Sequence, residues 1–116
     1  MDIGTRACIA AAAFGIVSER SPSSVYDYAR SRYLTISGSV GNESVALYDY
    51  ERSCHFSGSF TNLYDYGRSC HISINVNGNH FSGYDYGVGC HFNGTVSGNS
   101  VSVYDYEDGA YYNYSC

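Results

Sequence analysis

A Tyr-Asp-Tyr triplet that occurs five times is the feature that most constrains how this chain can fold. Successive triplets start 22, 16, 20 and 20 residues apart. A period of this size indicates repeated supersecondary units that bury a hydrophobic core only together. The triplets are Tyr26-Asp27-Tyr28, Tyr48-Asp49-Tyr50, Tyr64-Asp65-Tyr66, Tyr84-Asp85-Tyr86 and Tyr104-Asp105-Tyr106.

Each segment between two triplets has the pattern of a β-hairpin. In the fourth repeat, apolar residues alternate with small polar ones around Gly98-Asn99, a dipeptide that favours tight turns. The same offset from the triplets places Gly78-Asn79 and Gly41-Asn42 at the centres of the third and first repeats. In the second repeat the centre falls on Phe60-Thr61, a poor turn pair, so we expect a wider loop over Ser59–Asn62.

The alternation assigns side chains to two faces of a sheet. Across strands, large residues are expected opposite small ones, as at Gly58 and Leu63, Ile74 and Gly83, and Gly94 and Val103. The predicted core face carries Val25, Leu34, Ile36, Val45, Leu47, Phe56, Leu63, Ile72, Ile74, Val76, Phe81, Phe92, Val96, Val101 and Val103, joined by Tyr112 and Tyr114.

The N-terminal segment differs from the repeats, because residues 7–17 are apolar throughout. An alanine run favours helix, so we predict a helix from Thr5, as N-cap, to about Glu19, followed by a linker with Pro22. A helix without a polar face requires burial on several sides. A secretory signal peptide within residues 1–20 is the alternative, and it would make the protein secreted; otherwise a cytoplasmic location is slightly favoured.

The expected fold is mostly β. We predict an antiparallel meander of about ten strands, built from hairpin repeats of about 20 residues and rolled around, or packed on, one N-terminal helix. Residues 1–22 would form the helix and linker, and residues 23–116 the repeat domain, as one folding unit. A two-sheet sandwich and a β-solenoid are the alternatives, although a solenoid would need a local bulge to lose four residues from one rung.

Charge and motifs exclude several functions. Lys and Arg number 6 against 11 Asp and Glu, a formal net charge of -5, whereas a nucleic-acid partner needs clustered cations. No Gly-rich phosphate loop, GxSxG or HExxH motif is present, so we predict no catalytic residues, no cofactor and no enzyme activity. Five arginines are expected on scattered loops: Arg20, Arg30, Arg32, Arg52 and Arg68.

Three Cys-His pairs occur at Cys54-His55, Cys70-His71 and Cys90-His91. Neighbouring residues on a strand point to opposite faces, so one pair cannot grip one ion. Equivalent residues of successive hairpins lie roughly 9–10 Å apart, too far for a disulfide or a shared zinc ion. A thiol or metal protein is therefore the weakest functional alternative, and it would revive if the chain formed a solenoid.

The five triplet aspartates are expected on the core side, at the ends of strands. A row of carboxylates suggests calcium, but the spacing between hairpins is too wide for one ion. Each Asp can instead accept the N–H group two residues ahead, in an Asx-turn. If the strands on either side of the first triplet's turn pair with each other, Asp27 lies opposite Arg32, which suggests an ion pair between them.

The outward face is the only feature large enough to be a functional surface. Aromatic side chains with hydroxyl groups suit protein contacts or sugar stacking. We therefore expect a non-enzymatic structural or protein-interaction module, self-associating through this face or through edge strands, and a carbohydrate-binding module is the alternative. The predicted interaction face consists of Tyr26, Tyr28, Tyr48, Tyr50, His55, Tyr64, Tyr66, His71, Tyr84, Tyr86, His91, Tyr104 and Tyr106.

Over residues 26–109 the repeat resembles the tyrosine-aspartate repeats of large bacterial Rhs-type shell proteins, which also return about every twenty residues. In those repeats a Gly-Arg pair follows Tyr-Asp and two spacer residues. Here Gly67-Arg68 falls one residue early, and Glu107-Asp108-Gly109 one residue late. The resemblance implies extended β-sheet.

Overall fold

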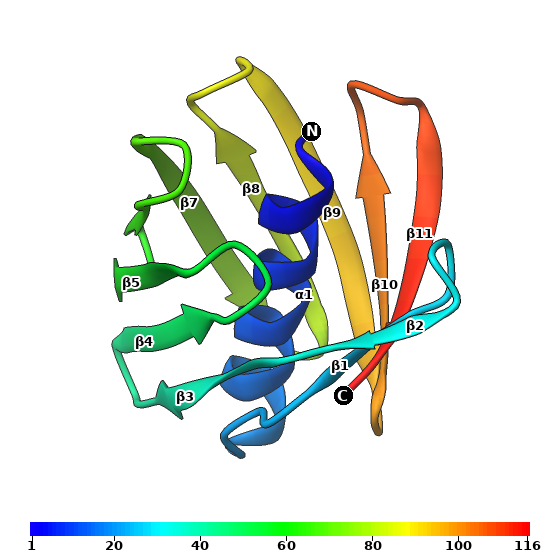
Figure 1. The fold of residues 1–116 in the computed structure, drawn as a ribbon. Helices are drawn as coiled ribbons and strands as arrows, with labels where there is room; N and C mark the ends of the chain where they lie inside the picture. Colours follow the sequence, from blue (N-terminus) through cyan, green and yellow to red (C-terminus); the bar gives the residue numbers. More distant parts are fainter.

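The computed structural model describes all residues from 1 to 116, as one helix and one antiparallel sheet of 11 strands (Figure 1). Helix α1 spans Ile3–Ser18. The strands are β1 (Val25–Asp27), β2 (Arg32–Leu34), β3 (Ile36–Val40), β4 (Ser44–Asp49), β5 (Cys54–Ser59), β6 (Asn62–Asp65), β7 (Cys70–Asn77), β8 (His80–Asp85), β9 (Cys90–Ser97), β10 (Ser100–Asp105) and β11 (Ala110–Ser115).

The sheet rolls until its two ends nearly meet. Strands β3 to β11 follow one another as a meander, and β1 then pairs with β11 through Tyr26 and Asp27. Strands β2 and β3 are separated only by Thr35, yet β2 pairs with β1 and β3 pairs with β4. The antiparallel meander is therefore confirmed, and the solenoid and the sandwich are wrong, because every pairing is antiparallel within one sheet.

The predicted hairpin registers hold in most repeats. Gly78-Asn79 and Gly98-Asn99 form the turns of the third and fourth repeats. In the second repeat the wider loop is wrong, because Ser59 pairs with Asn62 and Phe60-Thr61 forms a tight turn. The backbone of Phe60 bonds to both neighbouring hairpins, with its N–H donating to Glu43 and its carbonyl accepting from Ile74, which stabilises this turn.

The register of the first repeat differs from the prediction. Val40 pairs with Val45, and the N–H of Gly41 donates to the carbonyl of Ser44, so the turn is centred on Asn42-Glu43 rather than on Gly41-Asn42. The physical reason is that residues 32–34 pair with β1 instead of continuing the hairpin with β4.

Helix α1 lies inside the rolled sheet (Figure 1). Every residue from Ala7 to Ala13 is fully buried, which explains why small side chains cover all sides of this helix. The cap differs from the prediction: Asp2, not Thr5, is the N-cap, and its carboxylate accepts from the N–H groups of Gly4 and Thr5. No helix of the structure combines the length and the apolar character that crossing a membrane requires.

The predicted core face is buried, apart from Val76 and Tyr112, which are half-buried. The predicted large-against-small pairs are present, with Gly58 opposite Leu63, Ile74 opposite Gly83 and Gly94 opposite Val103.

Two reciprocal pairs join β8 to β9. Phe81 lies opposite Gly94, and Phe92 lies opposite Gly83. A Cβ atom at Gly83 would lie 2.4 Å from the ring of Phe92, so each ring occupies the space that the missing side chain leaves.

Candidate functional site

The turn that follows each triplet begins with a buried aspartate. All five triplet aspartates are at most 1% exposed. Each accepts a hydrogen bond from the N–H group two residues ahead, at 2.8 to 3.0 Å, so the predicted Asx-turns are confirmed. The first turn of α1 lies at the same end of the rolled sheet, where the hydroxyl of Thr5 contacts Asp65.

Arginines bring positive charge to every one of these carboxylates. Arg30 contacts Asp27 at 2.7 Å, and Arg68 contacts Asp85 at 2.9 Å. Arg6, on the helix, approaches Asp105 to 3.2 Å. The ring of buried aspartates is therefore compensated from within the protein, as buried charge requires.

Arg52 bridges two repeats, because it contacts Asp49 at 2.6 Å and Asp65 at 3.1 Å. Arg30, Arg52 and Arg68 lie in turns, as expected, but they converge on the buried aspartates instead of being scattered, and Arg32 lies in β2 rather than on a loop. The predicted pair of Asp27 with Arg32 is also wrong: the two residues lie opposite each other, but Arg32 turns outward to Glu51.

Three carboxylates come together beside this ring. The side chains of Asp105, Glu107 and Asp108 place oxygens within 4.8 Å of one another. Arg6 and the amino group of Met1 form ion pairs with the same three carboxylates. The cluster thus has cationic partners of its own, and we assign it no metal.

The cysteines lie on the inner side of the strands or within the core, and all five are free thiols. Cys54 is half-buried while its neighbour His55 is exposed, as opposite faces of a strand require. Burial raises the pKa of Cys54, and likewise that of Cys70. Burial also raises the pKa of Cys8, whose thiol donates to Asp49 at 3.5 Å. These thiols are therefore held protonated, which makes them poor nucleophiles.

The aromatic residues of the predicted interaction face form five separate triads on the outside of the sheet. In each triad the first tyrosine of a triplet is half-buried, and the second is between 53% and 64% exposed. The two rings meet edge to face with centroids 4.7 to 4.9 Å apart. The third ring comes from the next strand at a similar distance, and it belongs to Tyr33, His55, His71, His91 or Tyr111.

Together these triads encircle the end of the molecule that carries the aspartate ring. We call the thirteen predicted residues together with Tyr33 and Tyr111 the aromatic girdle. Neighbouring triads are linked by ring contact at one place, where His55 and Tyr66 lie 6.4 Å apart. The girdle is therefore a ring of separate clusters, rather than continuous ladders.

Tyr33 and Tyr111 were not singled out from the sequence. The signal was present, because each lies five residues after the second Tyr of a triplet, where the other repeats carry histidine. The substitution of Tyr for His at the two ends of the repeat array concealed this equivalence.

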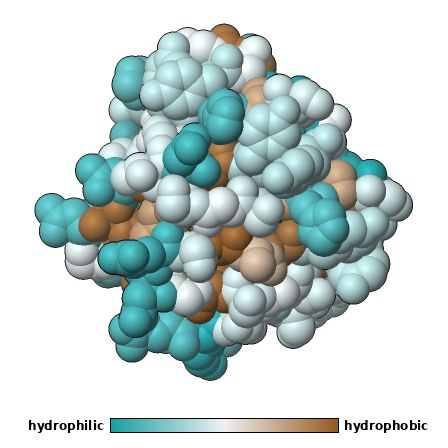
Figure 2. Space-filling model, turned by 90° about the vertical axis from the view of Figure 1, so that its left-hand side faces the viewer, coloured by the Kyte–Doolittle hydropathy of each residue, from teal (hydrophilic) through white to brown (hydrophobic).

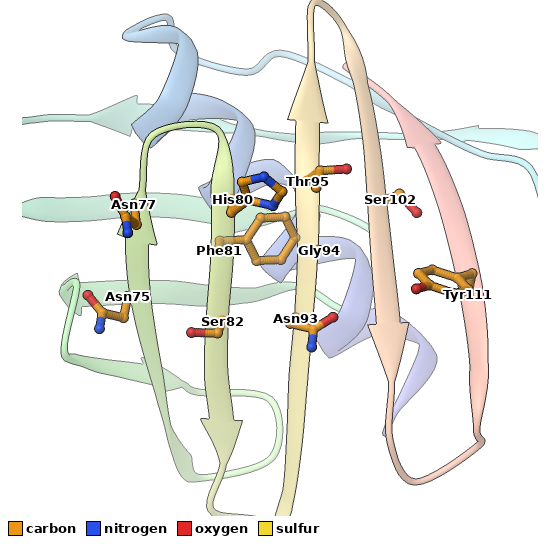
Figure 3. A pocket seen from close by; sticks show the side chains of 10 residues that line it. All are labelled: Asn75, Asn77, His80, Phe81, Ser82, Asn93, Gly94, Thr95, Ser102 and Tyr111. Carbon is orange, nitrogen blue, oxygen red and sulfur yellow. The ribbon is translucent and has the colours of Figure 1, made fainter.

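A shallow depression of about 570 Å³ lies on the outer face of β7 to β11 (Figure 3). Its lining includes three amide side chains, from Asn75, Asn77 and Asn93, with His80 and Tyr111. Of these, only Tyr111 belongs to the aromatic girdle. Sequence reasoning did not single out the amides, because asparagines are frequent in the turns of this chain as well.

Comparison with protein-family models, with curated proteins and with solved structures finds no match for this chain.

Proposed function

We propose that this protein is a non-enzymatic interaction module that associates with further copies of itself through the aromatic girdle. The observation that carries the proposal is the girdle itself, in which exposed phenol rings are held by edge-to-face contacts with their neighbours. Tyrosines are enriched at protein interfaces, because each buries a large area and still offers a hydroxyl group.

The exposed tyrosine rings of the girdle are already ordered before any partner binds, which favours binding. The exposed rings of Tyr50, Tyr66 and Tyr86 each pack on the preceding tyrosine of the triplet. Side chains that are already ordered lose less conformational entropy on binding. The girdle surrounds the molecule, so it offers contacts in several directions, as an assembling protein requires.

The edge of β3 supports self-association by a second route. Strand β3 pairs only with β4. Just outside its two ends, the carbonyl of Thr35 accepts from the N–H group of Tyr50, and the N–H group of Gly41 donates to the carbonyl of Ser44. Because bonding alternates along an antiparallel ladder, Ile36, Gly38 and Val40 direct their N–H and C=O groups away from β4. An unpaired edge of this kind is a template for another strand, and this one carries neither a charge nor a proline.

The side of the molecule near this edge also exposes apolar surface. A notch at the end of β3 is lined by half-buried Ile16, Val40 and Phe60. Figure 2 views this side of the molecule and shows hydrophobic residues exposed between weakly polar and hydrophilic ones. Such a surface favours contact with a partner over exposure to water.

The test is the molar mass in solution, measured by light scattering over a series of rising concentrations. We expect the mass to rise with concentration. Replacement of Tyr50, Tyr66 and Tyr86 by serine should lower it, and Val40→Lys should do the same if the β3 edge contributes. The matched control is Ser39→Lys, whose side chain points outward from the same strand. A strict monomer at every concentration contradicts self-association.

Carbohydrate is the second candidate ligand. It is favoured by the exposed phenol rings and by the uncharged amide side chains on the outer face of the sheet. Tyrosine fluorescence titration with polysaccharides tests it, since a stacked sugar changes the surroundings of the girdle rings. No response at millimolar sugar would remove the girdle as a sugar site.

A further inference from the structure

We propose that an uncharged oligosaccharide chain binds across the depression on the outer face of β7 to β11. This site borders the aromatic girdle at Tyr104 and Tyr111, but it lies apart from Tyr50, Tyr66 and Tyr86, and sugar binding there does not depend on self-association. In Figure 3 the side chains that line the depression extend from five neighbouring strands, and α1 lies behind the sheet.

The strand register arranges the polar residues of the lining in two rows, which the neighbouring residues Tyr104 and Asn113 complete. One row crosses the sheet through Asn75, Ser82, Asn93, Tyr104 and Tyr111, each directly opposite the next. Four steps between neighbouring strands make this row roughly 19 Å long. A row of this length fits an extended chain ligand rather than a single small molecule.

The second row runs parallel to the first, through Asn77, His80, Thr95, Ser102 and Asn113. The two rows alternate amide, hydroxyl and ring side chains. An amide group both donates and accepts hydrogen bonds, and a hydroxyl group does so too. A ligand that carries many hydroxyl groups matches this mixture of donors and acceptors.

The amides are concentrated on this part of the sheet. On the opposite part, the outward residues of β3 to β5 include Ser37, Ser39, Ala46 and Ser57, which are small. Small side chains of this kind are therefore sufficient for the solvent-exposed face of this sheet. Asparagine is disfavoured in strands, and yet β7, β9 and β11 contain four asparagines. We attribute their presence to binding, because they do not favour the fold.

The hydrogen-bonding capacity of this face is largely free. The amide of Asn93 donates to the hydroxyl of Tyr106 at 2.8 Å, and this is the single side-chain hydrogen bond made by the lining residues. No Asp, Glu, Lys or Arg lines the depression, so nothing there would neutralise a charged ligand. At one end of the first row, Tyr111 is 66% exposed and offers its ring for stacking on an apolar sugar face.

The test is a titration of the isotope-labelled protein with a panel of neutral oligosaccharides, including glucans, xylans and mannans, followed by amide NMR shifts. We expect at least one of them to cause saturable shifts in β7 to β11. Loss of one direct hydrogen bond in Asn75→Ala or Asn77→Ala should weaken binding roughly five- to tenfold. The matched control is Asn62→Ala, which removes an exposed amide from β6, outside the depression.

Three results would overturn the proposal. The first is the absence of shifts with every oligosaccharide at about 10 mM, well above the range of weak specific binding. The second is unchanged affinity in the double variant Asn75→Ala, Asn77→Ala. The third is a set of shifts confined to strands β1 to β6. Substitution of Tyr50, Tyr66 and Tyr86 separates the two proposals, because it should reduce self-association and leave sugar binding unchanged.

Discussion

Arg52, in the turn after β4, contacts the carboxylate of Asp49 in its own repeat at 2.6 Å and that of Asp65 in the next repeat at 3.1 Å. One guanidinium group therefore connects two turns whose aspartates are buried. Both carboxylates also close Asx-turns, so the position of Arg52 stabilises the ends of two hairpins at once.

Removal of this guanidinium should be strongly destabilising. Arg52→Met leaves two buried carboxylates without their cation, and breaking a buried ion pair from one side costs about 3–5 kcal/mol. Since 20% of the Arg52 side chain is exposed, we expect the lower end of that range. Urea unfolding measures the change in the free energy of unfolding.

Arg32 provides the matched control for Arg52. Its side chain is 52% exposed in its ion pair with Glu51, and an exposed pair of this kind contributes about 0–1 kcal/mol. Arg32→Met should therefore unfold at nearly the same urea concentration as the parent protein. Equal losses in the two variants would contradict the structural role assigned to Arg52.

The reciprocal pairs between β8 and β9 predict that Gly83 cannot accept a side chain. A Cβ atom there would meet the carbonyl oxygen of Ser73 at 1.9 Å and the ring of Phe92 at 2.4 Å. We expect Gly83→Ala to lower the melting temperature, at a cost of about 1–3 kcal/mol. Gly98→Asn is the control, because Gly98 has open space around it and a φ of 58°, which asparagine tolerates. Comparable melting temperatures for the two variants would contradict the close packing.

Because α1 is buried on all sides, a larger side chain should destabilise the protein at any position around the helix, unlike on a surface helix. Ala10, Ala11, Ala12 and Ala13 point in four directions around the helix, and all are fully buried. Each single change to leucine should therefore destabilise the protein, by about 1–3 kcal/mol for an overpacked core. Thermal unfolding of the four variants measures this, and a neutral result at any one position would mean that one side of the helix is open.

Tyr114 should make the protein less stable at alkaline pH. Burial raises the pKa of Tyr114 to about 12 from its ordinary value of 10.0, although Arg6, whose Nε donates to the phenol oxygen at 2.9 Å, lowers it in part. The folded state holds this proton more tightly than the unfolded chain. The stabilisation is therefore complete below pH 10.0 and is lost as the pH rises toward about 12.

The measurement compares urea unfolding at several pH values between neutral and strongly alkaline for the parent protein and Tyr114→Phe. The parent should lose stability more steeply above the ordinary tyrosine pKa. Other titrating groups are shared by both proteins, so parallel slopes would show that Tyr114 does not contribute.

Much of the fold could be predicted because it depends on local pattern. Alternation and Gly-Asn turns predicted the register of the hairpins around Gly78 and Gly98, which the structure confirms. The Asx-turns follow from residue type alone, since the chemistry is confined to three consecutive residues.

Most errors arise where distant parts of the chain meet, whereas the helix cap at Asp2 is a local one. The pairing of Tyr26 with Ser115 adds β1 and β2 to the far side of the meander, and residues 32–34 then pair with β1 instead of extending the first hairpin. Alternation is the same on both sides of Thr35, so no local signal marks the change of partner. The contacts of Arg6 and Arg52 also depend on the rolled geometry, which sets turns and helix side by side. The depression could not be predicted from local pattern, because its lining depends on the register of five strands together.

The most direct test of the rolled sheet is a map of cross-strand contacts between backbone protons, obtained by NMR. The structure predicts contacts of β1 with both β2 and β11, including Tyr26 with Tyr33 and Asp27 with Tyr114, while residues 36–40 contact β4. Contacts between equivalent residues of successive repeats, such as Tyr64 with Tyr84, would instead indicate parallel rungs and contradict the rolled antiparallel meander and everything inferred from its two faces.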